Sequence, residues 1–159
     1  MAAVEKTIDV EVPVRTAYNQ WTQFEDFARF MEGVKAVRQL DDKRLHWHAE
    51  ILGKDVEWTA EITQQIPDKR ITWKSTSGAH NAGSVSFEPL GEERTRIKLR
   101  LEYEPEGAAE KAGSVIGLVS SRVAGDLDRF KDFIEAQGHA TGAWRGEIHG
   151  QQVSRSPEP

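Results

Sequence analysis

The chain has 159 residues, a formal net charge of -5 and no cysteine. This length suits one domain with one hydrophobic core. The lack of cysteine excludes disulfides, thiolate nucleophiles and cysteine metal sites, and the interleaved charges give no electrostatic support for nucleic-acid binding. Residues 1–8 contain no apolar run typical of a signal peptide or a membrane span, so we expect a cytoplasmic protein.

The first part of the chain predicts one strand followed by one or two short helices. Apolar and polar side chains alternate over residues 7–12, which is typical of a half-buried strand. After Pro13, apolar residues recur at spacings of three and four up to Gly33, which indicates short amphipathic helices. These apolar residues are Ala17, Trp21, Phe24, Phe27, Phe30 and Met31.

Six further strands are predicted between these helices and residue 103, separated by turn signals such as Pro67-Asp68 and Gly91. Within each strand the apolar residues share one parity, so one face of the sheet is apolar and the other meets water, as antiparallel sheets commonly allow. Large aromatic residues fall on the apolar parity. The predicted strands cover residues 34–40, 45–52, 56–66, 70–75, 83–89 and 95–103.

A long helix is predicted from about Glu106 to Gln137, because apolar residues recur at three and four positions along it without an interrupting proline. Gly138 is a plausible stop. The remaining residues, 139–159, are polar and rich in Gly, Ser and Pro apart from Trp144 and Ile148. We therefore expect a partly ordered tail, in which Trp144 forms a lid or contacts another chain.

The order of these elements, a run of strands bracketed by helices, indicates an α+β fold. Three stretches of sequence resemble the SRPBCC superfamily of START and Bet v-like proteins, specifically its polyketide cyclase/dehydrase-like branch. The resemblance covers roughly residues 4–137. It is carried by residues 21–27 (WTQFEDF) with 30–34 (FMEGV), residues 78–83 (GAHNAG) with 85–91, and residues 126–131 (DLDRFK).

The resemblance implies the helix-grip fold in a domain of residues 1–138. In this fold a curved seven-stranded antiparallel sheet wraps around the long C-terminal helix, and two short helices follow the first strand. The resemblance also implies a deep apolar cavity between sheet and helix. We expect this cavity to bind a small apolar or aromatic molecule, such as a lipid, polyketide or isoprenoid, without a cofactor and in a monomer or homodimer.

The sequence offers its own support for a cavity in the small residues of the first half of the long helix. Each Gly costs roughly 1 kcal/mol against Ala inside a helix, so several of them require a reason. Space for a ligand is one reason, and close approach of helix and sheet is another. The predicted ligand-binding residues, of which the aromatic ones equally suit an ordinary core, are Trp47, Trp58, Trp73, Phe87, Asn81, Gly117 and Ser121.

A catalytic interpretation requires polar groups inside this cavity. Aromatic polyketide cyclases of the superfamily use Arg, Tyr and hydroxyl side chains to hold a reactive polyketone, and acid or base catalysis needs such a group within hydrogen-bond reach. The candidates in this chain are Tyr103, Arg122 and Tyr18. They form no recognisable pair, Arg122 is equally consistent with a surface residue, and the tyrosines are equally consistent with core residues whose polar tips lie near the surface.

The histidines are weaker candidates. His46 and His48 are two residues apart on one predicted strand, a spacing that suits a metal, but their parity is opposite to that of Trp47 and predicts a solvated face, so we expect no metal site. His80 lies beside Asn81 in a loop that could border the cavity mouth. Three hypotheses therefore remain: a small-molecule binding protein first, then a polyketide cyclase or dehydrase, then a protein-interaction module with a packed core.

Overall fold

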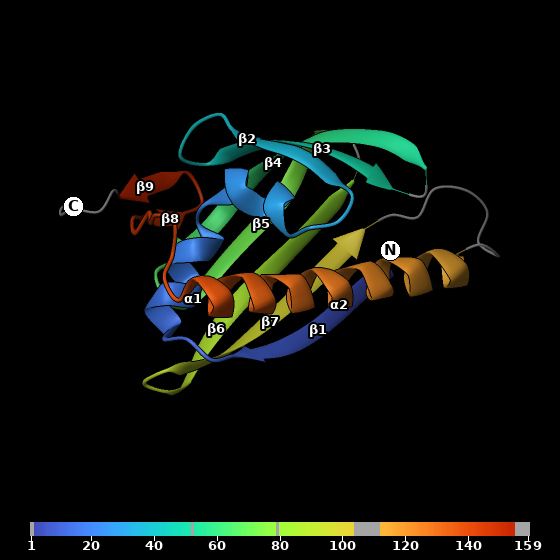
Figure 1. Ribbon diagram of the computed structural model, residues 1–159. Coiled ribbons are helices and arrows are strands. Elements are labelled where there is room, and N and C mark those ends of the chain that lie inside the picture. The colour runs from blue at the N-terminus through green and yellow to red at the C-terminus, as the bar shows by residue number, and fades with distance from the viewer. Residues whose placement is uncertain (1, 52, 79, 104–111, 155–159) are drawn as a thin grey trace.

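One antiparallel sheet forms the frame of the molecule (Figure 1). The computed structural model describes residues 2–51, 53–78, 80–103 and 112–154, and of residues 2, 51 and 112–118 the backbone alone. Within these ranges nine strands join in the order β1-β7-β6-β5-β4-β3-β2, with β8 pairing both β4 and β9. Their bounds are β1 (Ala2–Val10), β2 (Val34–Gln39), β3 (Arg44–Ile51), β4 (Lys54–Ile66), β5 (Arg70–Gly78), β6 (Asn81–Gly91), β7 (Arg94–Tyr103), β8 (Glu147–His149) and β9 (Gln152–Ser154).

The helices lie on one face of this sheet. They are α1 (Val14–Trp21), the 3-10 helix η1 (Phe24–Arg29) and the long α2 (Ala112–Gln137). Figure 1 shows α2 running along the sheet in front of β1, β7 and β6, with α1 and η1 on the same side. None of the helices in the described ranges combines the length and apolar character that crossing a bilayer requires. The predicted α+β helix-grip architecture is confirmed.

The element boundaries differ from the sequence-based ones mainly at two places. β1 begins at Ala2, before the predicted start at residue 7, and its nine residues all pair with β7. Residues 106–111, the predicted first turns of the long helix, lie outside the described residues. The end of α2 was predicted correctly: Gly138 has a φ of 76°, and its N–H donates to the carbonyl of Ile134 at 2.9 Å.

The number of strands corrects the prediction of seven, because the tail adds β8 and β9 to the sheet. Ile148 in β8 lies opposite Gln65 in β4 and is 0% exposed. A three-residue strand with one apolar side chain carries almost no periodic signal, so its pairing could not be read from the sequence. Burial of Ile148 makes the tail part of the hydrophobic core.

Polar side chains of α1 hold the tail in place. The side-chain oxygen of the fully buried Gln20 accepts the N–H of Thr141 at 2.9 Å, and the hydroxyl of Thr22 accepts the N–H of Trp144 at 3.1 Å. Arg145 donates to the Asn19 side chain at 2.6 Å. Trp144 is partly buried and packs against the core beside α1, and its roles as a lid or as a contact for another chain stay predictions.

An aromatic cluster fills the interior beside α1. Trp21 packs edge-to-face on Phe27, Phe87 and Phe130, with ring centroids 5.6, 6.2 and 4.9 Å away. Phe30 packs on Phe130 in the same way at 5.3 Å. These arrangements are the ones that ring quadrupoles favour. The α1 end of the interior is therefore densely packed.

The turn between η1 and β2 is fastened to α2 by three charged residues of the helix. Arg129 Nε donates to the carbonyl of Phe30 at 2.9 Å, and Arg122 Nη1 donates to the carbonyl of Glu32 at 3.0 Å. Asp126 accepts the N–H of Glu32 at 3.1 Å and is paired with Arg129. Partial burial raises the pKa of the Asp126 carboxyl, although the bond to Arg129 opposes this shift.

Candidate functional site

The inner face of the sheet changes from fully buried to partly buried along β5, β6 and β7. The register aligns Ile71, Val85 and Leu99 in one row, and each of them is at most 8% exposed. The rows farther from α1 are only partly buried. We call this region, together with the neighbouring aromatic pair of β3 and β4, the distal end of the inner face; it comprises Trp73, Gly83, Leu101, Asn81, Tyr103, Trp47 and Trp58.

Two tryptophans form one wall of the distal end. Trp47 in β3 and Trp58 in β4 lie directly opposite each other, and their rings stack at 5.6 Å with an interplanar angle of 7°. Trp47 also contacts Phe27, with ring centroids 5.8 Å apart, so the pair is anchored on the aromatic core. Both indoles keep part of their surface exposed. They present a flat apolar surface that the core does not cover.

A glycine lets the third tryptophan lie against the sheet. Gly83 in β6 is the cross-strand partner of Trp73 in β5. A Cβ atom placed on Gly83 would lie 2.5 Å from Cζ2 of Trp73, which no real side chain tolerates, and 2.6 Å from the carbonyl oxygen of Arg100. The indole therefore rests on the backbone of β6 in space that a larger residue would occupy.

A tyrosine hydroxyl completes the distal end. Tyr103 points inward from the last position of β7 and packs against the core. Its oxygen is shielded from solvent and has no hydrogen-bond partner among the described residues. Burial raises the pKa of Tyr103 above its usual value. Nearby, the backbone N–H of Asn81, its cross-strand partner, donates to the Ser75 hydroxyl at 3.1 Å.

The other predicted ligand-binding residues lie elsewhere. Phe87 is 6% exposed and fills the core beside Tyr18, with ring centroids 5.4 Å apart. Ser121 is exposed, because the buried stripe of α2 contains Val123, two positions away and so on the opposite side of the helix. The surroundings of Gly117 lie outside the described residues. Of the predicted residues, Trp47 and Trp58 thus stack on each other, Trp73 and Asn81 lie on neighbouring strands of the same inner face, and Phe87 and Ser121 lie elsewhere.

The three predicted catalytic residues are not brought together. Tyr18 is 0% exposed at the α1 end, where its hydroxyl accepts a hydrogen bond from Gln65 Nε2 at 3.1 Å, so the expected polar tip near the surface is wrong. Burial raises the pKa of Tyr18 to about 12. Arg122 is occupied with the Glu32 carbonyl on the η1–β2 turn. Only Tyr103 of the three belongs to the distal end.

Gln65 is the inward polar residue that the sequence did not reveal. The register of β4 with β5 shifts between Ile62 and Gln64, so a β-bulge at Thr63 reverses the alternation. Gln65 then points inward and is 1% exposed. Strand parity counted from Ile62 places Gln64 inward instead, and nothing in the local sequence marks the bulge.

The histidines lie outside this site. His46 Nε2 is 2.8 Å from the Glu57 carboxylate, and His48 Nε2 is 3.7 Å from that of Asp55, on the water-facing side of the sheet. His80 is exposed. Among the residues whose placement is described, no group of three or more potential ligands could hold a metal ion.

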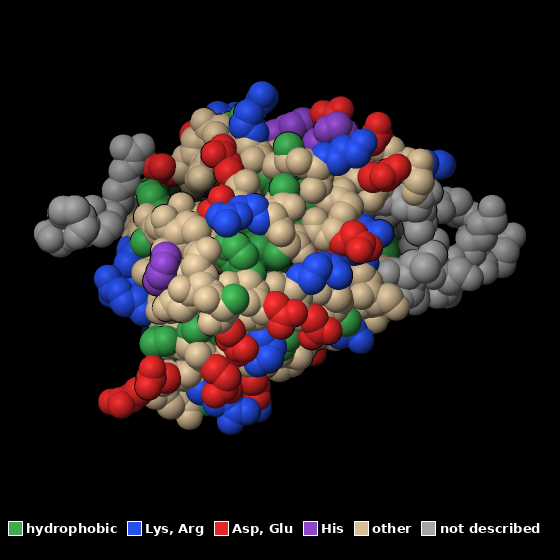
Figure 2. Space-filling model, viewed as in Figure 1, with side chains coloured by type: hydrophobic (Ala, Val, Ile, Leu, Met, Phe, Trp, Pro, Cys, Tyr) green, Lys and Arg blue, Asp and Glu red, His purple; other side chains and the backbone are tan. Residues whose placement is uncertain are grey.

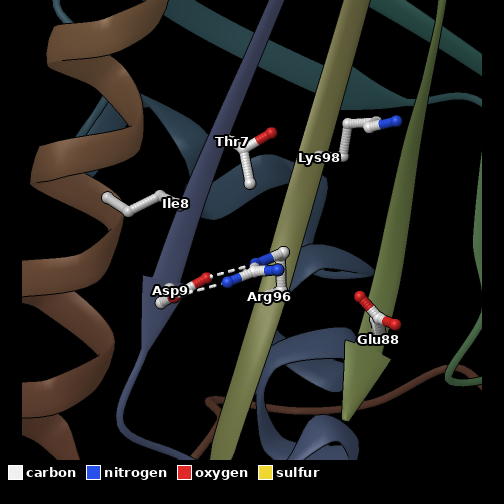
Figure 3. Close-up of a pocket in the computed structure, with 6 residues that line it drawn as sticks. All are labelled: Thr7, Ile8, Asp9, Glu88, Arg96 and Lys98. Carbon is white, nitrogen blue, oxygen red and sulfur yellow. Dashed lines mark hydrogen bonds and ion pairs between the residues drawn. The ribbon is translucent and has the colours of Figure 1, made fainter. Parts of the chain in front are cut away.

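A hollow of about 620 Å³ lies over β1, β6 and β7 (Figure 3). Two of its charged residues form an ion pair: Arg96 Nε donates to Asp9 Oδ1 at 2.9 Å, and this bond holds the pKa of the Asp9 carboxyl below its usual value. Figure 3 shows Ile8 pointing toward α2, away from this ion pair. A surface lined mainly by charged and polar side chains does not suit an apolar ligand. The hollow is lined by Thr7, Ile8, Asp9, Glu88, Arg96 and Lys98.

Hydrophobic side chains also reach the surface beside α2 (Figure 2). Figure 2 shows them near the middle of this face, with charged side chains of both signs around them. Between η1 and α2, the Arg29 guanidinium lies 4.8 Å from the ring centroid of Phe133, which in turn packs on Phe30 at 5.4 Å. The guanidinium therefore covers an aromatic face of α2 by a cation–π contact.

The fold and the inner face can be compared with known proteins. A family model described as polyketide cyclase/dehydrase and lipid transport matches residues 10–132. The chain belongs to this family. The matched region runs from the end of β1 through most of α2, so the family assignment covers the distal end, and the resemblance to the polyketide cyclase/dehydrase-like branch is confirmed.

One relative and two solved structures are similar to this chain. An uncharacterized 17.2 kDa protein from the melC2-rnhH intergenic region of Streptomyces lincolnensis is 46% identical over 149 residues, which cover 93% of this chain and 99% of the relative. The structure of a START superfamily protein from Mycobacterium smegmatis matches with a TM-score of 0.69 at 18% identity, covering 83% of this chain and 98% of its own. The Zhui aromatase/cyclase from Streptomyces sp. R1128 matches with a TM-score of 0.73 at 17% identity, over 89% and 98% of the two chains. At such identities these two structures establish the shared fold.

Proposed function

We propose that the protein binds a small apolar or aromatic molecule, of the lipid, polyketide or isoprenoid type, between the distal end of the inner face and α2. The observation that carries this proposal is that Trp47, Trp58 and Trp73 remain partly exposed at the distal end of a face that is fully buried toward α1. Ligand sites are lined mainly by apolar and aromatic side chains with a few fixed polar groups. Tyr103 and Asn81 supply such groups here.

The family supports the same proposal, because its description includes both lipid transport and polyketide chemistry. The charge distribution also agrees. The charged residues of this part of β7, Arg100 and Glu102, pair with each other on the opposite face at 3.1 Å. An uncharged ligand on the inner face would therefore meet no charged side chain from this part of β7.

Native mass spectrometry of the purified protein, with a thermal-shift screen of fatty acids, flavonoids and aromatic ketones, tests the proposal. A ligand that binds only the folded state raises the melting temperature with its concentration. We expect Trp58→Ala to weaken binding about tenfold, since it removes one stacking partner. Trp144→Ala is the matched control, because Trp144 packs at the α1 end, and should leave affinity unchanged. Equal losses in both variants, or a folded protein that binds no probe, would favour the interaction module.

A polyketide cyclase or dehydrase activity is the second candidate, favoured by the inward Tyr103 hydroxyl and the neighbouring Ser75. Acid or base catalysis would require a proton acceptor close to the substrate. Among the described residues, no carboxylate or imidazole hydrogen-bonds to Tyr103, so binding comes first. Cyclisation of a poly-β-ketone thioester by the wild type, with loss of turnover in Tyr103→Phe, would establish the enzyme.

A further inference from the structure

The outer face of the sheet carries the hollow shown in Figure 3, which the proposed function does not use. Its volume of about 620 Å³ lies within the range of pockets that bind small molecules. The register places its polar side chains in two neighbouring rows across β1, β7 and β6. Asp9, Arg96 and Glu88 form one row, and Thr7 and Lys98 belong to the next.

An ion pair occupies the β1 side of this hollow. Arg96 donates from Nε to Asp9 Oδ1 at 2.9 Å and from Nη2 to Asp9 Oδ2 at 3.2 Å, so the guanidinium and the carboxylate are joined by two bonds. Arg94 adds a bond to Asp9 Oδ2 at 3.4 Å. Figure 3 shows the Arg96 side chain directed toward Asp9. These charges neutralise each other within the protein, so a ligand has to be recognised by the remaining side chains.

Two further charges line the hollow, and neither belongs to an ion pair among the residues that the structure describes: Lys98 on β7 and Glu88 on β6. Both side chains are exposed. Lys98 lies opposite Ser86 and Glu88 lies opposite Arg96, so the two are diagonal neighbours on adjacent strands. Diagonal neighbours are about 7–8 Å apart. Figure 3 shows the Lys98 ammonium and the Glu88 carboxylate apart from each other.

We propose that this hollow binds a small zwitterion, such as a free α-amino acid, with its carboxylate on Lys98 and its ammonium group on Glu88. The lining combines Arg96 and Lys98 with Asp9 and Glu88, so it has no net charge to attract a simple ion. A simple anion would meet Glu88 and a simple cation would meet Lys98, and an opposing charge of this kind rejects the wrong ligand. A zwitterion pairs with both side chains.

The dimensions of the hollow agree with a ligand of this size. Charge-assisted hydrogen bonds are about 2.7–2.9 Å long, and one on each side of an amino-acid head group spans the separation of diagonal neighbours. The Thr7 hydroxyl, in the same row as Lys98, can donate a further bond to the carboxylate. This inference is independent of ligand binding at the distal end, because the two surfaces lie on opposite faces of the sheet.

The test compares three probes with the same side chain. L-leucine carries both charges, N-acetyl-L-leucine lacks the cationic group, and L-leucinamide lacks the anionic one. Each probe is titrated into isotope-labelled protein at neutral pH and low salt, because salt screens exposed charges. Nuclear magnetic resonance follows the amide signals of residues 7–9, 86–88 and 96–98. We expect leucine to bind about fivefold more tightly than either blocked probe, as the loss of one exposed ion pair allows.

Variants of the two charged residues identify the contacts. Lys98→Met and Glu88→Gln should each weaken leucine about fivefold, to the level of the blocked probes. Lys74→Met is the matched control, because Lys74 is an exposed lysine of β5 that does not line the hollow, and it should leave binding unchanged. The exchange of Lys98→Glu together with Glu88→Lys reverses the two charges. It should restore leucine binding, because a zwitterion can bind in the reverse direction.

The outcomes decide the inference without reference to the distal end. If the folded protein binds no probe, or binds all three equally well, the hollow does not recognise a zwitterion and the inference is overturned. A loss in Lys74→Met equal to that in Lys98→Met would assign the effect to the general charge of the protein and overturn it as well. An exchanged variant that is folded but does not bind leucine contradicts the assignment of one ligand charge to each side chain, and recovery of binding supports it.

Discussion

Replacing Ile148 with alanine should lower the stability of the whole domain, although this residue lies in a predicted polar tail. Ile148 is 0% exposed and belongs to the same core cluster as Phe130 and Val85. Truncating such a residue to alanine costs about 2–5 kcal/mol, from lost burial and the cavity left behind. Domains of this kind are stable by only about 5–15 kcal/mol. The substitution should therefore remove a large fraction of the stability.

Urea unfolding followed by far-UV circular dichroism measures this loss. With a slope of about 2 kcal/mol per molar urea, a loss of about 2–5 kcal/mol should lower the midpoint by roughly 1–2.5 M while the slope stays constant. Val153→Ala is the control, because Val153 lies opposite Ile148 in β9 but is only partly buried, and should cost about 1 kcal/mol. If Ile148→Ala unfolds at the wild-type midpoint, the tail does not complete the core in solution and the reasoning is refuted.

Two further predictions concern single positions. Tyr18→Phe leaves Gln65 Nε2 unpaired and should cost about 1–3 kcal/mol in the free energy of unfolding. Because burial raises the pKa of Tyr18 from 10.0 to about 12, its contribution is complete below pH 10 and is lost as the pH rises toward 12. The stability gap between wild type and Tyr18→Phe should therefore narrow over that interval, and a constant gap would contradict the shift. Gly33→Ala should cost more than Gly53→Ala: both have positive φ, 87° and 81°, but a Cβ on Gly33 collides with the Arg122 guanidinium, whereas one on Gly53 has nothing within 4 Å. If the two variants melt at the same temperature, the collision with Arg122 contributes nothing and backbone strain accounts for the whole loss of stability.

Local patterns predicted the frame of this protein, and contacts distant in sequence determined the rest. Alternation of apolar residues placed the strands β2 to β7 within a few residues and put Trp47, Trp58 and Trp73 on the inner face. A glycine after the last apolar repeat marked the end of α2. The strands of the tail have no such pattern, because β8 and β9 are three residues each and depend on pairing with β4.

The candidate site was predictable in its aromatic residues but not in its polar ones. Parity alone identifies which side chains face inward, so the tryptophans and Tyr103 could be placed on one wall. The bulge at Thr63 reverses that parity and turns Gln65 inward toward Tyr18. Whether Tyr18 is a surface or a buried hydroxyl depends on this distant partner. Local sequence carries no signal for it.

The pairing of β1 also bears on how the chain folds. In the described sheet β1 pairs with β7 alone, so the first strand has no partner until residues 94–103 have been synthesised. Likewise, Gln64 and Gln65 of β4 gain their pairing with β8 only after residues 147–149 have been synthesised. Such pairings require closure of long loops before any contact repays the lost chain entropy, and domains dominated by them fold in milliseconds to seconds. Until β7 is made, β1 lacks its partner in the sheet, and Val4, Ile8 and Val10 lack the core contacts that they make in the folded domain.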